Sequence, residues 1–149
     1  MENKRVLPPT YLFISILAMV ILHWFIPILV IVSYPWNLIG LIPLIAGIVL
    51  NIAADAVLKK EQTTVKPFQK SSVLVTTGVY RISRHPMYLG MVIILIGIAI
   101  LMGTLAPVLV IAIFTILMEL VFVRAEEEML ENQFGLTWII YKNKIRKWV

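Results

Sequence analysis

The residues best suited to chemistry lie together in one short stretch near the middle of the chain. Positions 77–90 hold two arginines, one histidine, two tyrosines and two glycines, just where an apolar run begins at Met87. Pro86 suits the first turn of a helix, because its missing N–H and fixed φ cost nothing there. Free backbone N–H groups at such a helix start favour a carboxylate or another anion. The simpler alternative is a cationic anchor at the mouth of a membrane helix.

Composition indicates that this stretch belongs to a membrane protein. Of the 149 residues, 60% are hydrophobic and 14% are charged, and the mean hydropathy is +0.95. Apolar runs predict transmembrane helices at about 11–32, 38–58, 87–102 and 104–123. The segment 124–148 has apolar residues at helical spacing and is expected to lie along the membrane surface. The predicted fold is an all-α integral membrane protein, one domain over 1–149, with four transmembrane helices and a C-terminal interfacial amphipathic helix.

The basic residues predict the orientation in the membrane. The 13 Lys and Arg residues fall near the start, between 59 and 84, and after Val123, whereas the turns at 33–37 and 103–104 hold none. By the positive-inside rule, both termini face the cytosol. The elements 73–90 and 124–148 then share the cytosolic side, because one helical hairpin separates them. The expected location is the inner membrane of a prokaryotic cell or the endoplasmic reticulum of a eukaryotic one.

The numbers of cysteines and histidines and the net charge argue against several kinds of site. The chain has no cysteine, which removes disulfides, thiolate metal sites and a cysteine nucleophile. Its two histidines, His23 and His85, lie on different predicted helices without metal-ligand spacing, so no metal site is expected. We expect His23 to be hydrogen-bonded to a neighbouring helix. The net charge of +5 arises from the cytosolic side of a membrane protein, and no nucleic-acid partner is expected.

Acidic residues return to this side one hairpin later. Glu126, Glu127 and Glu128 follow the fourth predicted span, and Glu119 and Glu126, seven residues apart, are expected on one helix face. A site with basic groups on one side and carboxylates on the other can bind a zwitterionic cofactor. A lipid substrate can then enter from the bilayer, among membrane lipids, while the cofactor arrives from the cytosol.

Two motifs occur in a distinctive order. G-V-Y-R-I-S-R-H-P-M-Y-L-G at 78–90 is followed by E-E-E-M-L-E-N-Q-F-G at 126–135. This pattern resembles the C-terminal signature of the isoprenylcysteine carboxyl methyltransferase and phospholipid methyltransferase superfamily, over roughly residues 63–148. The resemblance implies an S-adenosylmethionine-dependent methyltransferase with a lipid-like or prenylated acceptor, and carboxyl O-methylation of the prenylcysteine type is favoured. The cofactor-binding positions that it implies are Gly78, Tyr80, Arg84, His85, Pro86, Tyr88, Gly90, Glu126, Glu127 and Glu128.

The resemblance leaves the register of the acids open. Three consecutive glutamates match a family pair, and we favour Glu127 and Glu128 while keeping Glu126 as a candidate. In the family pattern F-G-x-x-Y-x-x-Y, this chain keeps only Tyr141 of the two tyrosines. The basic group that orients the substrate end maps to Lys144 or Arg146.

Three other functions fit the same residues. The first is a phospholipid amine N-methyltransferase, whose nucleophile must first lose a proton to a base. The second is an NADPH-dependent membrane reductase of the sterol type, whose cofactor phosphate calls for a larger basic cluster. The third is a non-catalytic membrane scaffold, in which the polar groups satisfy one another.

Overall fold

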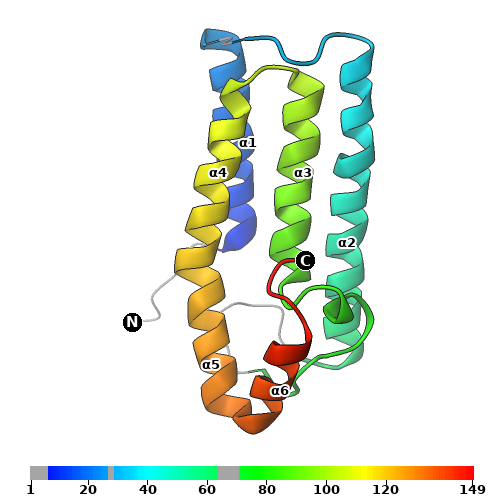
Figure 1. Ribbon diagram of the computed structural model, residues 1–149, viewed down its shortest axis with the longest axis vertical. Helices are drawn as coiled ribbons and strands as arrows, with labels where there is room; N and C mark the ends of the chain where they lie inside the picture. Colours follow the sequence, from blue (N-terminus) through cyan, green and yellow to red (C-terminus); the bar gives the residue numbers. More distant parts are fainter. Residues whose placement is uncertain (1–6, 27–28, 64–70) are drawn as a thin grey trace.

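Helices that run up and down in one bundle make up most of the computed structural model (Figure 1), which describes residues 7–26, 29–63 and 71–149. Residues 27–28, in the first predicted span, and 64–70, in the region of the family resemblance, lie outside the described part. The elements are α1 (Pro8–Phe25), η1 (Trp36–Gly40), α2 (Leu41–Lys60), η2 (Gly78–Arg81), α3 (Pro86–Met102), α4 (Ala106–Met118), the π-helical turn η3 (Glu119–Val123), α5 (Arg124–Phe134) and α6 (Leu136–Lys144).

Helix length and composition agree with an all-helical membrane protein. The described helices long and apolar enough to cross a membrane are Pro8–Phe25, Trp36–Lys60 and Ala106–Phe134, and α3 is a shorter apolar helix of 17 residues. The predicted span 87–102 matches α3 within one residue. The first helix ends at Phe25 rather than at the predicted residue 32.

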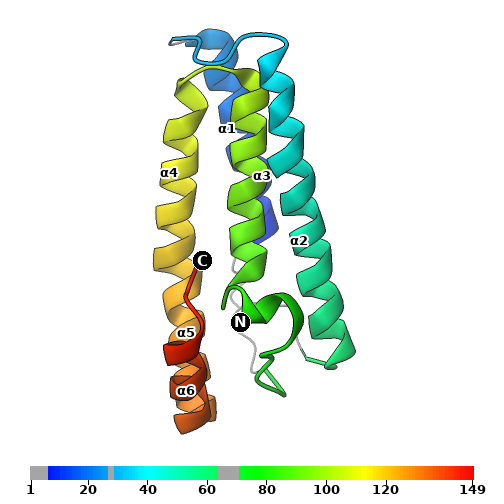
Figure 2. The same cartoon turned by 45° about the vertical axis from the view of Figure 1, so that its right-hand side comes forward.

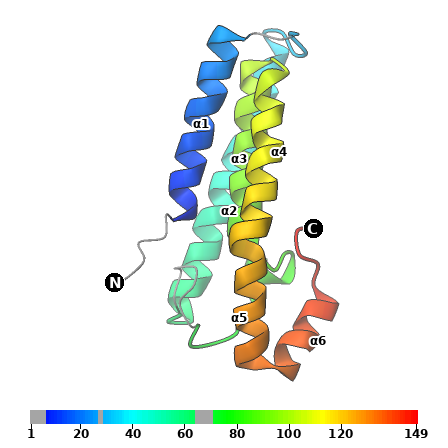
Figure 3. The ribbon, with the colours of Figure 1, turned by 90° about the vertical axis from the view of Figure 1, so that its left-hand side faces the viewer.

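The chain does not break after Val123, where the sequence analysis places the start of a separate surface helix. Helix α4 continues through η3 into α5 as one helical segment, which contains no glycine or proline after Pro107 in its first turn. The break comes at Gly135, whose φ of 50° lies in the left-handed region that favours glycine. Helix α6 then folds back beside α5 (Figure 3). The predicted C-terminal helix is therefore two helices, and the first of them extends the fourth predicted span.

Helix α3 stands at the centre of the bundle, with α2 on one side and α4 on the other (Figures 1 and 2). Glycines bring α2 and α3 into backbone contact. A Cβ on Gly97 would lie 2.5 Å from the backbone nitrogen of Leu44, and one on Gly40 would lie 2.5 Å from the carbonyl oxygen of Gly97. On the other side, α1 packs against α4 and α3 through a core that includes Met19 and Leu95.

The Gly97→Ala variant is expected to be less stable than the wild type. Because the new methyl group would overlap the backbone of α2 rather than a mobile side chain, the helices must separate, at a cost of about 1–3 kcal/mol. Thermal unfolding in detergent measures this loss. As a control, Ile113→Ala removes a side chain that is 55% exposed on α4 and should change the midpoint little. Equal midpoints for Gly97→Ala and the wild type would contradict the close packing.

His23 lies at the end of the bundle opposite to the 78–90 motif. Its Nδ1 atom is 2.9 Å from the hydroxyl of Thr104, in the turn between α3 and α4. The predicted hydrogen bond of His23 is therefore present, although its partner belongs to a turn and not to a helix. This histidine has a structural role far from the groups described next.

Candidate functional site

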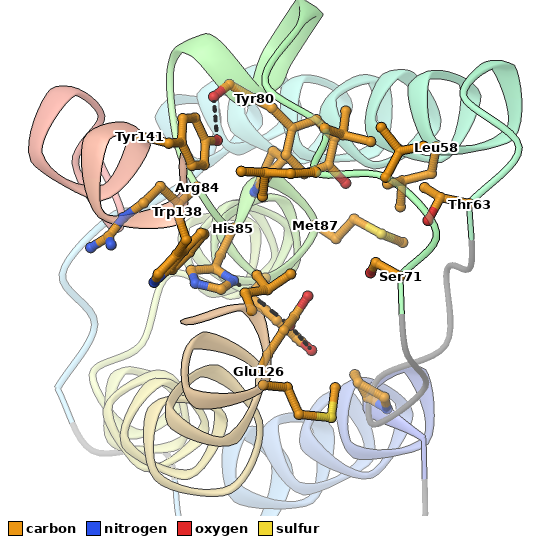
Figure 4. Close-up of a pocket in the computed structure, with 18 of the residues that line it drawn as sticks. Leu58, Thr63, Ser71, Tyr80, Arg84, His85, Met87, Glu126, Trp138 and Tyr141 are labelled. Carbon is orange, nitrogen blue, oxygen red and sulfur yellow. Dashed lines mark hydrogen bonds and ion pairs between the residues drawn. The ribbon is translucent and has the colours of Figure 1, made fainter. Parts of the chain in front are cut away.

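A cavity of about 220 Å³ lies at the end of the bundle where α2 ends and α3 begins (Figure 4). Its wall comes from the first residues of α1, the last turn of α2, the segment 71–75, η2, the first turns of α3, and helices α5 and α6. Most of the lining side chains are apolar, such as Leu58, Met87, Met91 and Leu130. An apolar wall with a few convergent polar groups is the usual form of a small-molecule site.

Local chain geometry directs the 78–90 motif toward this cavity. Gly78, with φ of 59°, starts the short 3₁₀ turn η2, in a conformation that favours glycine. The Tyr141 hydroxyl donates a 2.6 Å hydrogen bond to the carbonyl of Tyr80 and so joins α6 to this turn. The His85 N–H donates to the hydroxyl of Ser83 at 3.2 Å, just before α3 begins at Pro86 as predicted. The imidazole of His85 is thereby held beside α5.

The basic motif and the acidic motif meet at this end of the bundle, as the sequence predicts. His85 Nε2 lies 3.3 Å from Glu127 Oε1, and His85 Nδ1 lies 3.7 Å from Glu126 Oε2. The guanidinium of Arg84 lies 3.1 Å from Glu127 Oε1. Tyr88 donates its hydroxyl hydrogen to Glu126 Oε2 at 3.2 Å. The site is thus a compact charge network whose histidine is 3% exposed.

The three consecutive glutamates have different surroundings. Glu126 lines the cavity. Glu127 is buried behind it, with Oε1 near Arg84 and His85 and Oε2 3.3 Å from the ammonium of Lys147. Glu128 is exposed and does not line the cavity. The two acids next to the basic motif are therefore Glu126 and Glu127.

The π-helical turn changes which acids share a face. Lys147 Nζ lies 2.8 Å from Glu119 Oε1 as well as near Glu127, so these two glutamates, eight residues apart, face the same cation. The expected pairing of Glu119 with Glu126, seven residues apart, is wrong, because Glu126 lines the cavity and Glu119 does not. A π turn accommodates one extra residue, so alignment along the helix moves by one position.

Three buried nitrogens of cavity-lining residues have no hydrogen-bond partner among the described residues. They are Nε and Nη1 of Arg84 and Nε1 of Trp138, of which Nη1 is paired with the Glu127 carboxylate. The guanidinium carbon of Arg84 lies 5.6 Å from the ring centroid of Trp138, and both residues line the cavity. A buried unsatisfied donor costs about 1–3 kcal/mol. A ligand that reaches these nitrogens would have to bring an acceptor such as a carboxylate.

The positions implied by the family resemblance divide into two groups. Four of them do not line the cavity: Gly78, Gly90, Glu127 and Glu128. A side chain on Gly90 would overlap the amide of Asn51 on α2. Gly90 thus serves helix packing in this structure. The implied positions that line the cavity are Tyr80, Arg84, His85, Pro86, Tyr88 and Glu126.

The basic tail residue at the site is Lys147, which the sequence analysis did not single out. The side chains of Lys144 and Arg146 do not line the cavity, and both residues are exposed. Arg146 contributes its carbonyl, which accepts a 3.1 Å hydrogen bond from the N–H of Arg84. Lys147 follows the end of α6, where helical spacing gives no signal. Trp138, 1% exposed, was predicted only as an apolar helix position.

The charges fix the protonation of two groups near the site. Burial alone lowers the pKa of Lys147, but hydrogen bonding and attraction from Glu119 and Glu127 raise this pKa above its ordinary 10.5. The stabilisation from the cationic form is therefore fully present below pH 10.5 and lost only as the pH rises through the higher folded-state pKa. Burial, followed by the charge of Glu126, raises the pKa of Tyr80 well above its usual range. Tyr80 is therefore a neutral phenol at physiological pH.

The part of the chain that the structure describes contains no cluster of side chains suited to bind a metal ion. No group of three or more His, Asp or Glu side chains there is arranged to hold a metal ion.

The fold and the cavity together define an all-helical integral membrane protein with a largely apolar cavity at one end of its bundle. A family model described as phospholipid methyltransferase matches residues 35–137, which include both motifs of the site. The chain belongs to the phospholipid methyltransferase family. The resemblance predicted from the two motifs is thereby confirmed.

One solved structure is similar over most of this chain. It is the eukaryotic intramembrane Ras methyltransferase, isoprenylcysteine carboxyl methyltransferase, with a TM-score of 0.62 and 28% sequence identity. The match covers 95% of this chain and 49% of that one, so this chain spans about half the length of that protein. A comparison with curated proteins finds no match.

Proposed function

We propose that this protein is an S-adenosylmethionine-dependent membrane methyltransferase that acts on a lipid-like acceptor. The observation that carries the proposal is the apolar cavity of a phospholipid methyltransferase family member, closed at its polar end by Arg84 and His85 facing Glu126 and Glu127. S-adenosylmethionine supplies an electrophilic methyl group on a sulfonium. The protein has to bind this molecule, align an acceptor with it and exclude water.

The polar groups of the cavity fit a zwitterionic cofactor. The unpartnered N–H donors of Arg84 and Trp138 suit its carboxylate. Glu126, whose carboxylate lines the cavity, suits its amino group or ribose hydroxyls. Glu127 is engaged by Arg84, His85 and Lys147, and in this proposal it orients those groups instead of contacting the cofactor.

A carboxylate acceptor, as in a prenylcysteine, is the substrate that we favour. A carboxylate is already nucleophilic at neutral pH, so the site needs no general base for this reaction. The apolar wall that Pro8, Pro9 and Leu58 contribute suits a hydrocarbon chain that enters from the bilayer. The similarity to isoprenylcysteine carboxyl methyltransferase supports the same choice.

Amine N-methylation of a phospholipid is the second candidate, and the family description favours it. An ammonium headgroup must lose a proton before it can attack, and Glu126 is the carboxylate at the cavity that can accept it. Binding of NADPH is less well supported. Arg84 is the one arginine of the described cavity wall and no lysine lines the cavity there, whereas the additional phosphate of NADPH calls for a larger basic cluster.

The membrane arrangement that we propose has four crossings: α1, the η1–α2 segment, α3 and the α4–α5 segment. The cavity and both termini face the cytosol. The clustering of Lys and Arg at this end of the bundle supports the orientation. The chain, residues 1–149, then acts as one membrane-embedded methyltransferase domain.

The test uses the purified protein in lipid nanodiscs with S-adenosylmethionine labelled on its methyl group. Label should move to a prenylcysteine, and transfer to phosphatidylethanolamine would instead select the amine reaction. Calorimetry with S-adenosylmethionine and, separately, NADPH measures cofactor choice. Binding of NADPH alone would favour a reductase, and binding of neither cofactor would favour a scaffold.

A further inference from the structure

The segment 145–149, after helix α6, lies against the back of the site. Figures 2 and 3 show it, in red, running from α6 along the α4–α5 helix. The carbonyl of Arg146 accepts a 3.1 Å hydrogen bond from the N–H of Arg84, and the carbonyl of Lys147 accepts one of 2.9 Å from Ser83. Ser83 in turn accepts from the N–H of His85. This segment therefore supports the backbone of both basic residues of the cavity wall.

The Lys147 side chain links the segment 145–149 to the α4–α5 helix through two ion pairs. Its ammonium lies 2.8 Å from Glu119 and 3.3 Å from Glu127, which are eight residues, or about two turns, apart on the α4–α5 helix. Trp148 packs against the main core next to it. The segment 145–149 supports the backbone of Arg84 and His85, and the Lys147 ammonium links this segment to the helix that carries the glutamates.

The two carboxylate oxygens of Glu127 have different partners. Oε1 lies near Arg84 and His85, and Oε2 lies near Lys147. Without the ammonium, Glu127 and Glu119 would face each other across the space that it leaves, and like charges in a partly buried site repel. Glu127 would then turn, and Arg84 would lose the ion pair that holds its guanidinium in place.

We propose that Lys147 is a positioning residue for cofactor binding: through Glu127 and the segment 145–149, it holds Arg84 and His85 toward the cavity. The inference rests on the proposed function. Lys147 does not line the cavity, so it contacts neither cofactor nor acceptor. Its loss is therefore expected to weaken cofactor binding while leaving the methyl-transfer step at saturation nearly unchanged.

The test compares Lys147→Met, Lys147→Arg and Lys142→Met with the wild type in nanodiscs. Lys147→Met should raise the Kd for S-adenosylmethionine about tenfold, the size expected for one lost charged hydrogen bond. The single-turnover rate at saturating cofactor should change less than about twofold if transition-state contacts are intact. Lys147→Arg should recover most of the affinity. The control, Lys142→Met, removes another lysine ion pair, with Glu131, and should bind like the wild type.

A second measurement needs no cofactor. Hydrogen exchange of the backbone N–H groups of Arg84 and His85 should become faster in Lys147→Met, because both depend on the segment 145–149. Unchanged exchange or unchanged affinity in this variant would overturn the inference. So would an affinity loss that Lys147→Arg does not restore. Absence of cofactor binding by the wild type refutes the proposed function instead, and the exchange measurement still decides whether Lys147 positions these residues.

Discussion

His85→Ala is expected to weaken S-adenosylmethionine binding about a hundredfold and to remove measurable methyl transfer, since two charged contacts are lost together. His85 stands between Glu126 and Glu127, and its side chain is 2% exposed. Without the imidazole, Glu126 and Glu127 lose the side chain that lies between them, and the ion pair of Arg84 with Glu127 remains. Calorimetry in nanodiscs measures the affinity, and labelled methyl transfer measures the activity.

His23→Ala is the matched control for this experiment. It removes the chain's other histidine, which bonds Thr104 at the opposite end of the bundle. This variant loses a hydrogen bond, so its stability should fall, while its affinity for the cofactor should stay within about twofold, because distant sites are nearly independent. Equal affinities for wild type and His85→Ala would show that the cofactor binds elsewhere.

The sequence predicted the elements whose signals are local. The apolar run from Met87 and the proline before it defined α3 within one residue. The return of the chain across the bundle then brought residues near 85 and 127 to the same end. The boundary at 123 was wrong because a change in polarity between Val123 and Arg124 does not break a helix. Helix ends depend on residues such as Gly135, whose φ requires glycine.

The site was predicted less completely than the helices, because some of the residues that position its side chains belong to no motif and no helical repeat. The resemblance carried Gly90 into the site, whereas the packing of α3 on α2 explains that glycine. Lys147 follows the last helix, so no periodicity aligns it with Glu119. Its place depends on the π turn Glu119–Val123, and in the almost uniformly apolar stretch 106–123 one extra residue leaves no mark in the hydrophobic spacing.

Glu126 and Glu127 have different roles in the proposed function. Glu127 orients the neighbouring basic side chains, and Glu126 contacts the ligand. Glu127 is surrounded by Arg84, His85 and Lys147, so it has little capacity left for a ligand. Glu126 receives the Tyr88 hydroxyl and keeps its carboxylate at the cavity. Substitutions at the two positions should therefore affect cofactor affinity differently. Such measurements can show which two of the three consecutive glutamates correspond to the family pair.

Glu126→Gln is expected to lower the affinity for S-adenosylmethionine between about tenfold and a hundredfold, because a charged hydrogen-bond acceptor at the cavity becomes neutral. Glutamine keeps the shape of the side chain, so the midpoint of thermal unfolding should change little. Glu128→Gln changes the same chemistry two residues away on an exposed position and should bind like the wild type. Calorimetry on both variants decides between the registers. A loss in Glu128→Gln with normal binding by Glu126→Gln would assign the pair to Glu127 and Glu128, and would mean that α5 turns when the cofactor binds.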